Sequence, residues 1–280
     1  MSNFELNHYE LIESYIPFDL SQPKNFLLAF FIVYFFIIAR YFAMVGATYW
    51  VYWKSDFFKH RLIYKKMPNF QFIRNEIFWS CVTSLIFALG GVFTGILWQK
   101  GLTRFYLKFD EYPLWYMPLS LAMMMLIHEV YFYFSHRLMH HPLLYRRIHK
   151  THHASLYPSP WASFSFHPWE SVIESMILPL IVMIVPVHPV VFIFYMTLMT
   201  VSAIVNHLGF EVLPLGSGRA WWARLLITAT HHSEHHFYFN CNYGLYFTFL
   251  DRWLGTESPN YSEDLIANTN KISHLCTKKI

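Results

Sequence analysis

Charged residues are scarce in this chain of 280 residues. They make up 14% of it, whereas an average soluble domain contains about 25%. Hydrophobic residues make up 55% and aromatic residues 20%, so the composition indicates an integral membrane protein. The net charge of +4 comes from scattered Lys and Arg. Because no basic tract is present, we expect no nucleic-acid partner.

Cysteines are also few, at positions Cys81, Cys241 and Cys276. They form neither a CxxC metal pair nor a disulfide framework, and we interpret them as small buried hydrophobic residues. The chain also lacks internal repeats and low-complexity linkers. We therefore predict a single membrane-embedded domain, 25–280. It is expected to follow a polar N-terminal segment, 1–24, which lacks the basic n-region of a cleaved signal peptide.

Long hydrophobic runs are abundant. A membrane-spanning helix needs about 20 apolar residues, and three runs reach that length, at 25–46, 77–98 and 113–135. A fourth apolar region, 172–205, is interrupted by the sequence PVHP at 186–189, which predicts a helical hairpin. The expected fold is an all-α integral membrane protein with about four transmembrane helices or hairpin segments.

The distribution of basic residues predicts the orientation in the membrane. The segment 54–76 carries Lys54, Lys59, Arg61, Lys65, Lys66 and Arg74. The N-terminal segment contains only Lys24, so the positive-inside rule places 54–76 in the cytoplasm. Counting crossings from there brings 136–170 and 206–280 to the same face. We therefore expect a cytoplasmic, histidine-rich helical cap.

The chain contains 17 histidines, and eight of them form three motifs. The motifs are HRLMH at 136–140, HKTHH at 149–153 and HSEHH at 232–236. Residues at i, i+3 and i+4 share one face of a helix, so each motif is expected to present its histidines together. At this histidine content, one HxxHH is expected by chance about 0.06 times per chain, so two copies indicate a function.

A metal site is the function that this spacing predicts. Imidazole is a ligand for Zn, Cu, Fe and Ni, and a structural zinc ion takes four ligands. Eight histidines exceed that number, which favours two metal ions with four or five ligands each. Carboxylates, the usual ligands of di-metal sites in soluble helix bundles, are nearly absent from the motifs.

Several residues near the motifs have less certain roles. His207, in the sequence NHLG, is expected on the same face and is a ninth candidate ligand. His128, His167 and His231 are more typical of hydrogen-bonded core or interface histidines, and their roles stay open. For Glu129 two roles are equally compatible with the sequence, namely orienting a ligand histidine or lying as a charge on the helix surface.

The motifs and their surroundings resemble the fatty acid hydroxylase/sterol desaturase superfamily. The resemblance extends over residues 125–256 and includes EVYFYFSHRLMHHPLLYRRIHKTHH, FHPWES, NHLG and HHSEHHFYFNCNYGLYFTFLDRWLGT. It implies a non-haem di-iron site that uses O₂ to hydroxylate or desaturate a C–H bond in a membrane lipid, either sterol-like or long-chain. It implies iron-ligand roles for His136, His140, His149, His152, His153, His207, His232, His235 and His236. Asp251 and Arg252 are expected to form a hydrogen-bonded corner.

Breaking such a C–H bond needs redox chemistry that side chains alone do not supply. Since the sequence has no haem or flavin motif, we expect a separate electron-transfer protein of cytochrome b5, ferredoxin or flavodoxin type. The expected location is the bacterial inner membrane or the endoplasmic reticulum membrane, with the site on the cytoplasmic face. Two alternatives are a carotenoid-hydroxylase-like enzyme and a membrane protein that binds or transports metal without catalysis.

Overall fold

Four long helices form the body of the protein. The computed structural model describes residues 17–64 and 68–271, and within them it contains helices and isolated β-bridges but no strand. The long helices are α2 (Pro23–Tyr49, continued by a π-helical segment, Trp50–Lys54), α3 (Phe70–Gln99), α4 (Tyr116–Met139) and α8 (Pro189–Asn206). Each is long and apolar enough to cross a membrane. The predicted all-α fold with about four such segments is confirmed.

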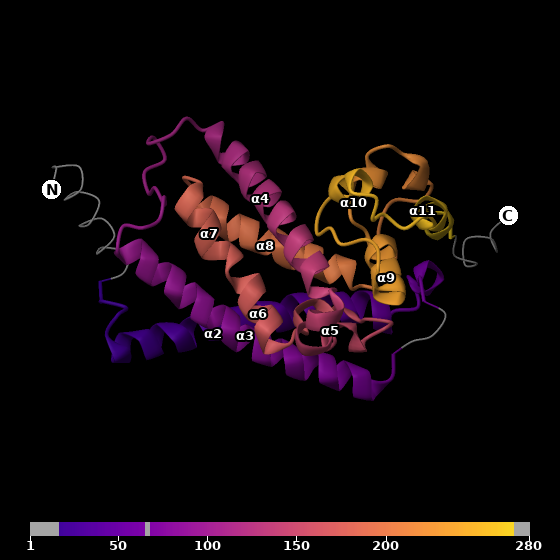
Figure 1. Cartoon of the computed structure of the whole chain (residues 1–280), viewed down its shortest axis with the longest axis horizontal. Coiled ribbons are helices and arrows are strands. Elements are labelled where there is room, and N and C mark those ends of the chain that lie inside the picture. The colour runs from indigo at the N-terminus through magenta and orange to yellow at the C-terminus, as the bar shows by residue number, and fades with distance from the viewer. Residues whose placement is uncertain (1–16, 65–67, 272–280) are drawn as a thin grey trace.

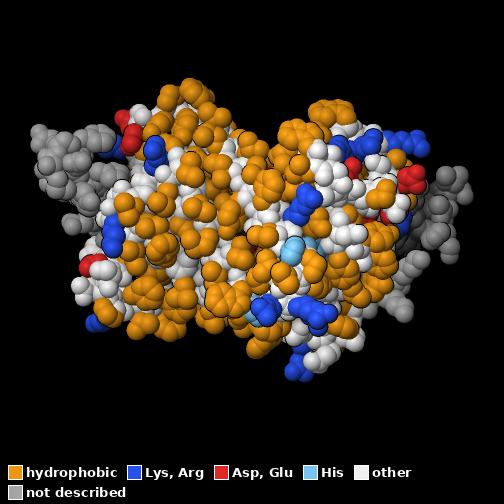
Figure 2. Space-filling model, in the orientation of Figure 1, with side chains coloured by type: hydrophobic (Ala, Val, Ile, Leu, Met, Phe, Trp, Pro, Cys, Tyr) orange, Lys and Arg blue, Asp and Glu red, His pale blue; other side chains and the backbone are white. Residues whose placement is uncertain are grey.

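The outer surface of these helices is apolar. Phe31, Phe35 and Phe36 on α2 are all more than 60% exposed. Figure 2 shows that hydrophobic side chains cover most of this face of the molecule, whereas charged side chains lie at its left edge and in its right half. Exposure on this scale is unfavourable in water but suits the hydrocarbon core of a bilayer. The protein is thus a multi-pass membrane protein.

The fourth apolar region folds back on itself, as predicted. It comprises α6 (Pro168–Ser175), α7 (Ile177–Ile184) and α8, and the break between α7 and α8 falls at the PVHP sequence. The first arm differs from a single helix because it is divided at Met176. Pro179 explains this division, since it has no N–H to donate to the carbonyl group four residues earlier. Of the two arms, only α8 is long enough to span a bilayer.

A cap of short helices lies at one end of the long ones (Figure 1). It contains α5 (Pro142–Ile148), α9 (Ala229–Tyr238), α10 (Phe249–Trp253) and α11 (Tyr261–Thr269), with 3₁₀ turns between them. Trp53, at the end of α2, donates a hydrogen bond to the carbonyl group of Leu208, just after α8. Ile63 similarly donates its N–H to the Gly209 carbonyl group. The basic segment that begins at Lys54 therefore reaches the cap end of the molecule.

Some predictions concern residues outside this description. The polar N-terminal segment, 1–24, falls largely within residues 1–16, and Cys276 also lies outside the described residues. Of the other two cysteines, Cys241 is buried and Cys81 is partly buried. The assignment of 25–280 to one domain stays a prediction.

Candidate metal centre

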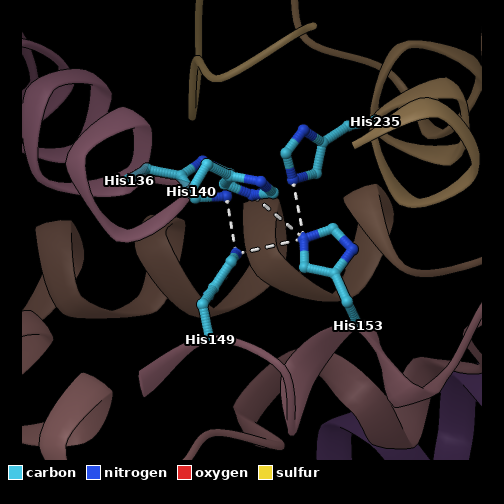
Figure 3. Close-up of side chains that lie close together, drawn as sticks. All are labelled: His136, His140, His149, His153 and His235. Carbon is cyan, nitrogen blue, oxygen red and sulfur yellow. Dashed lines mark hydrogen bonds between the residues drawn. The ribbon is translucent and has the colours of Figure 1, made fainter. Parts of the chain in front are cut away.

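The structure brings all nine candidate histidines into two adjoining clusters. The first cluster consists of His136, His140, His149, His153 and His235, and the second consists of His152, His207, His232 and His236. Within each cluster, one ring nitrogen from every histidine lies within 4.8 Å of the others. Figure 3 shows the first cluster, in which the rings point toward a common centre. The nine histidines thus divide into groups of five and four, which agrees with the expectation of two metal ions with four or five ligands each.

Helix ends position the first cluster. His136 lies in the last turn of α4, and His140 is the residue that caps it. The turn at Pro142 then starts α5, and His149 caps the end of this short helix. His235 projects from α9 on the opposite side of the cluster. A helix end, a proline turn and a short second helix therefore bring these histidines together.

The HKTHH motif does not form one helix face, and that prediction was wrong. The helix α5 ends at Ile148, and the backbone tightens into a 3₁₀ helix at His152–Ala154. His149 and His153 therefore enter the first cluster, while His152 enters the second. The HSEHH motif lies on a regular helix, as predicted, but its middle histidine, His235, also joins the other cluster. Each HxxHH motif thus contributes to both clusters.

The contacts between ring nitrogens in the first cluster are too many to be explained by hydrogen bonds alone. The Nε2 atom of His153 lies 3.1 Å from those of His140 and His149 and 3.0 Å from that of His235. One Nε2–H group can donate only one good hydrogen bond. Ligand nitrogens about 2.1 Å from a metal ion and 90° apart would lie about 3.0 Å from one another. The observed spacing therefore fits one metal ion in this cluster.

The hydrogen bonds of the second cluster independently indicate a site for a cation. The Nδ1 atoms of His152 and His207 face the carbonyl oxygens of Ser165, at 3.3 Å, and Ala203, at 2.7 Å. A carbonyl oxygen only accepts, so each Nδ1 carries the proton and each Nε2 keeps a lone pair. These two Nε2 atoms lie 3.2 Å apart, and their lone pairs would repel each other unless a cation lay between them.

Other backbone and carboxyl groups orient ligands of the first cluster in the same way. The Nδ1 atom of His136 lies 3.0 Å from the Tyr243 carbonyl oxygen, and that of His149 lies 2.8 Å from Oε1 of Glu170. Such partners fix the tautomer and the ring orientation of metal ligands. Glu170 was not predicted as part of the site. The acidic residue of the FHPWES sequence was the available signal.

Burial keeps the histidines neutral. It lowers the pKa of His140 to about 2 and that of His207 to about 4. The pKa values of five other cluster histidines are also lowered by burial and by neighbouring histidines, namely His149, His152, His153, His232 and His235. Neutral imidazole is the form that binds metal ions. The clusters therefore need no deprotonation at neutral pH.

Four further histidines between residues 128 and 231 come from segments that adjoin the motifs or contribute to the site, and all four lie outside both clusters. The Nδ1 atom of His128 contacts the hydroxyl groups of two tyrosines, His167 caps α6, His141 caps α5, and His231 is buried against the ring of Tyr261. The first three arrangements match the hydrogen-bonded core and interface roles that are typical of single histidines, whereas neither ring nitrogen of His231 has a hydrogen-bond partner among the described residues. Their positions give no reason to assign them as ligands.

Glu129 has neither of the two roles that the sequence left open. It is fully buried rather than exposed, and its carboxyl oxygens accept hydrogen bonds from the N–H groups of Leu245, Tyr246 and Phe247. It contacts no cluster histidine directly, but it anchors the loop whose Tyr243 carbonyl group orients His136.

The predicted hydrogen-bonded corner secures the other end of this loop. Asp251 accepts hydrogen bonds from the N–H groups of Tyr243 and Gly244, and Arg252 pairs with Glu257 at 2.9 Å. A Cβ atom at Gly244 would lie 2.7 Å from the Phe247 carbonyl oxygen, so any larger residue would displace the loop. The corner prediction is confirmed.

A cavity of ≈ 820 Å³ leads from the clusters into the membrane-spanning region. Its walls are predominantly apolar and include Phe87 of α3, Phe164 and Phe192 of α8. At one end it reaches cluster histidines, among them His136 and His152. Ligand-binding pockets commonly have volumes of about 300–1,000 Å³ and largely apolar walls, so this cavity has the size and character needed for a lipid.

The fold and the site define the class of protein, a helical membrane protein with two adjoining histidine clusters that could hold metal ions. A family model described as fatty acid hydroxylase matches residues 121–256. Delta(7)-sterol 5(6)-desaturase ERG3B of Gibberella zeae is 32% identical over 157 residues, which are 56% of this chain and 47% of the relative. The corresponding desaturase erg3A of Aspergillus fumigatus is 29% identical over 91% of this chain and 69% of the relative.

Human lathosterol oxidase is 32% identical over 55% of this chain and 50% of its own length. The matches to the fungal ERG3B protein and the human protein thus span about half of those relatives. No solved structure gives a significant match. Together with the histidine motifs, these findings show that residues 121–256 are similar to the fatty acid hydroxylase family and to sterol desaturases.

Proposed function

We propose that the protein is an O₂-dependent di-iron oxidoreductase that hydroxylates or desaturates a C–H bond of a membrane lipid. The observation that carries this proposal is the pair of histidine clusters at the end of an apolar cavity between membrane-spanning helices. The relatives named as sterol desaturases and lathosterol oxidase favour a sterol-like lipid as the substrate.

The ligand assignment follows the two clusters. One iron ion would be held by His136, His140, His149, His153 and His235, and the other by His152, His207, His232 and His236. Bound iron, with O₂ and electrons, supplies the oxidation of an unactivated C–H bond. The protein's own residues orient the ligands through groups such as Glu170 and the Tyr243 carbonyl group. The apolar cavity excludes water and holds the lipid beside them.

The electrons need an external source. The sequence has no haem or flavin motif, so a protein of cytochrome b5, ferredoxin or flavodoxin type is the proposed donor. His140 is the cluster histidine that is partly exposed, whereas the other eight are buried. It therefore offers the shortest route between the protein surface and the first cluster.

The centre is proposed to face the cytoplasm, in the endoplasmic reticulum membrane of a eukaryote or the inner membrane of a bacterium. The position of the basic segment at the cap end supports this orientation. A cysteine introduced at exposed Lys150, near the clusters, should react with an impermeant thiol reagent only from the cytoplasmic side. A cysteine at exposed Asp110, between α3 and α4, should react only from the other side. The reverse pattern would overturn the orientation.

Lipid profiling tests the proposed activity. Host cells that express the protein should contain a lipid that has gained one oxygen or lost two hydrogens relative to cells without it. Cells that express a His149→Ala variant at an equal level serve as the control, because this variant lacks a ligand. A lipid profile that is unchanged when a suitable electron donor and sterols are present would overturn the proposal.

A further inference from the structure

An unpartnered carboxyl group lies in the wall of the lipid cavity. Glu174 is on α6, one helical turn after Glu170, and both residues line the cavity. The Oε1 atom of Glu174 is inaccessible to solvent and has no hydrogen-bond partner among the described residues. No ion pair joins Glu174 to a described Lys or Arg. A buried polar group is normally hydrogen-bonded, and Glu174 lines the cavity and is itself only partly buried, so its carboxyl group is available to a ligand in the cavity.

We propose that Glu174 recognises a hydroxyl group of the lipid substrate. This inference rests on the proposed function, since it concerns the lipid that the cavity holds. An ionised carboxylate without a cation is very unfavourable in an apolar wall, so the group is a neutral carboxylic acid. A carboxylic acid has one donor and free acceptor positions, and it can therefore exchange two hydrogen bonds with one alcohol.

The position of Glu174 relates this hydroxyl group to the reacting carbon. Side chains four residues apart on a helix are neighbours on one face, with Cβ atoms about 5–6 Å apart. Glu170 already contacts His149 of the first cluster. Glu174 is thus about one helical turn further from the clusters along the cavity. A lipid held there by its hydroxyl group would present carbons a few bonds away to the metal centre.

The cavity wall also contains Arg40 of α2, whose Nε atom has no hydrogen-bond partner among the described residues. Arg40 would suit an anionic lipid such as a fatty acid. Glu174 would not, because two acidic groups, Glu170 and Glu174, face the same part of the cavity. Arg40 therefore predicts an anionic lipid, whereas Glu174 predicts a neutral alcohol. We choose the alcohol because the carboxylic acid of Glu174 lies close to the clusters.

Binding measurements on the purified full chain in detergent test this proposal. The probes are lathosterol, the analogue of lathosterol that lacks the hydroxyl group, and oleate. Binding can be followed by tryptophan fluorescence, to which Trp98 in the cavity wall contributes. The wild-type protein should bind lathosterol at least about tenfold more tightly than the analogue, the effect of one buried hydrogen-bonded pair.

Variants assign this preference to Glu174. Glu174→Leu should bind lathosterol and the analogue equally, with its affinity for the analogue unchanged, which also shows that it folds. Glu174→Gln keeps a donor and an acceptor and should retain most of the preference. Val172→Ala, at an exposed position on the same helix, is the matched control and should behave as wild type.

The outcomes separate this inference from the proposed function. Wild-type protein that oxidises lathosterol but binds the analogue as tightly would overturn the role of Glu174 alone. A Leu variant that keeps the preference, or that weakens the binding of oleate instead, would do the same. If Glu174→Leu fails to fold, the two other proteins still decide. Wild-type protein that binds lathosterol and the analogue equally, or a Glu174→Gln variant that has lost the preference for lathosterol, would overturn the proposal. Preferential binding of lathosterol without any oxidised product would overturn only the proposed function.

Discussion

At the scale of single residues, the site depends on which nitrogen of each histidine carries the proton. In His152 and His207 the backbone carbonyl groups of Ser165 and Ala203 accept from Nδ1 and leave Nε2 free for a metal ion. His149 is oriented similarly by Glu170. The fold therefore orients the proposed ligands without a metal ion, and each histidine has a defined cluster.

Replacing one ligand of the smaller cluster should disable the protein selectively. His152→Ala leaves the second cluster with three histidines, and we expect lipid oxidation to fall at least about 100-fold because the variant would lose its second metal ion. Oxidised lipid in expressing cells measures the activity, and membrane fractionation checks that insertion is normal.

The matched control for this variant is His141→Ala, which removes an exposed histidine that caps α5 but belongs to neither cluster. It should keep nearly full activity. If His152→Ala retained as much activity as His141→Ala, His152 would not be a ligand that matters for oxidation.

At the scale of secondary-structure elements, hydrophobic runs and histidine spacing predicted most of the arrangement. The spans, the break at PVHP and the helix that carries HSEHH follow from local periodicity and from proline, which act within a few residues. The 3₁₀ turn at His152 could not be predicted this way, because the end of α5 depends on how the two clusters are packed. The roles of Glu129 and Glu170 also depend on contacts with distant segments, at Leu245 and His149.

The loop between α9 and α10 should depend strongly on Glu129. In Glu129→Leu three buried N–H groups would lose their acceptor, and each loss costs about 1–3 kcal/mol. We therefore expect the free energy of unfolding to fall by at least about 3 kcal/mol. Metal should also be lost more readily to a chelator, by about tenfold or more, because the loop orients His136. Thermal unfolding in detergent and metal retention measure the two effects.

Glu263→Leu is a suitable control for this change because Glu263 is exposed on α11. Its effect on unfolding should be about 0.5 kcal/mol or less. Equal stability of the two variants would show that the Glu129 contacts do not hold the loop.

At the scale of the whole molecule, the spanning helices enclose the cavity and the cap closes it with the two histidine clusters. The sequence predicted these two parts and their meeting at one end of the molecule. It did not predict the cavity, because a cavity depends on the side chains that several helices bring together. Among these residues, Glu174 and Arg40 each have a polar atom without a hydrogen-bond partner, which becomes apparent only in the folded protein.

The metal-free protein should become less stable as the pH falls. Burial lowers the pKa of His207 to about 4, whereas an unfolded histidine has a pKa of about 6.5. Between these values the unfolded state binds more protons, so each such histidine contributes a loss of up to about 1.4 kcal/mol per pH unit. Burial also raises the pKa values of Glu170, Glu174, Glu234 and Asp251, which acts in the opposite sense, but the nine cluster histidines outnumber these carboxyl groups.

We therefore expect the midpoint of thermal unfolding of the chelated protein to be lower at pH 5 than at pH 7. Differential scanning fluorimetry in detergent can measure it. A midpoint that stays constant or rises over this range would contradict the neutral, buried state of the histidines.

The central claim is that nine histidines hold two metal ions, and the metal content of the purified protein tests it most directly. Protein prepared from iron-replete cells should contain about two metal ions per chain by elemental analysis. Zinc counts toward this total, because imidazole ligands accept both metals. Two ions per chain in the wild-type protein and about one in His152→Ala is the predicted result. A wild-type protein that holds less than one metal ion per chain would contradict the account.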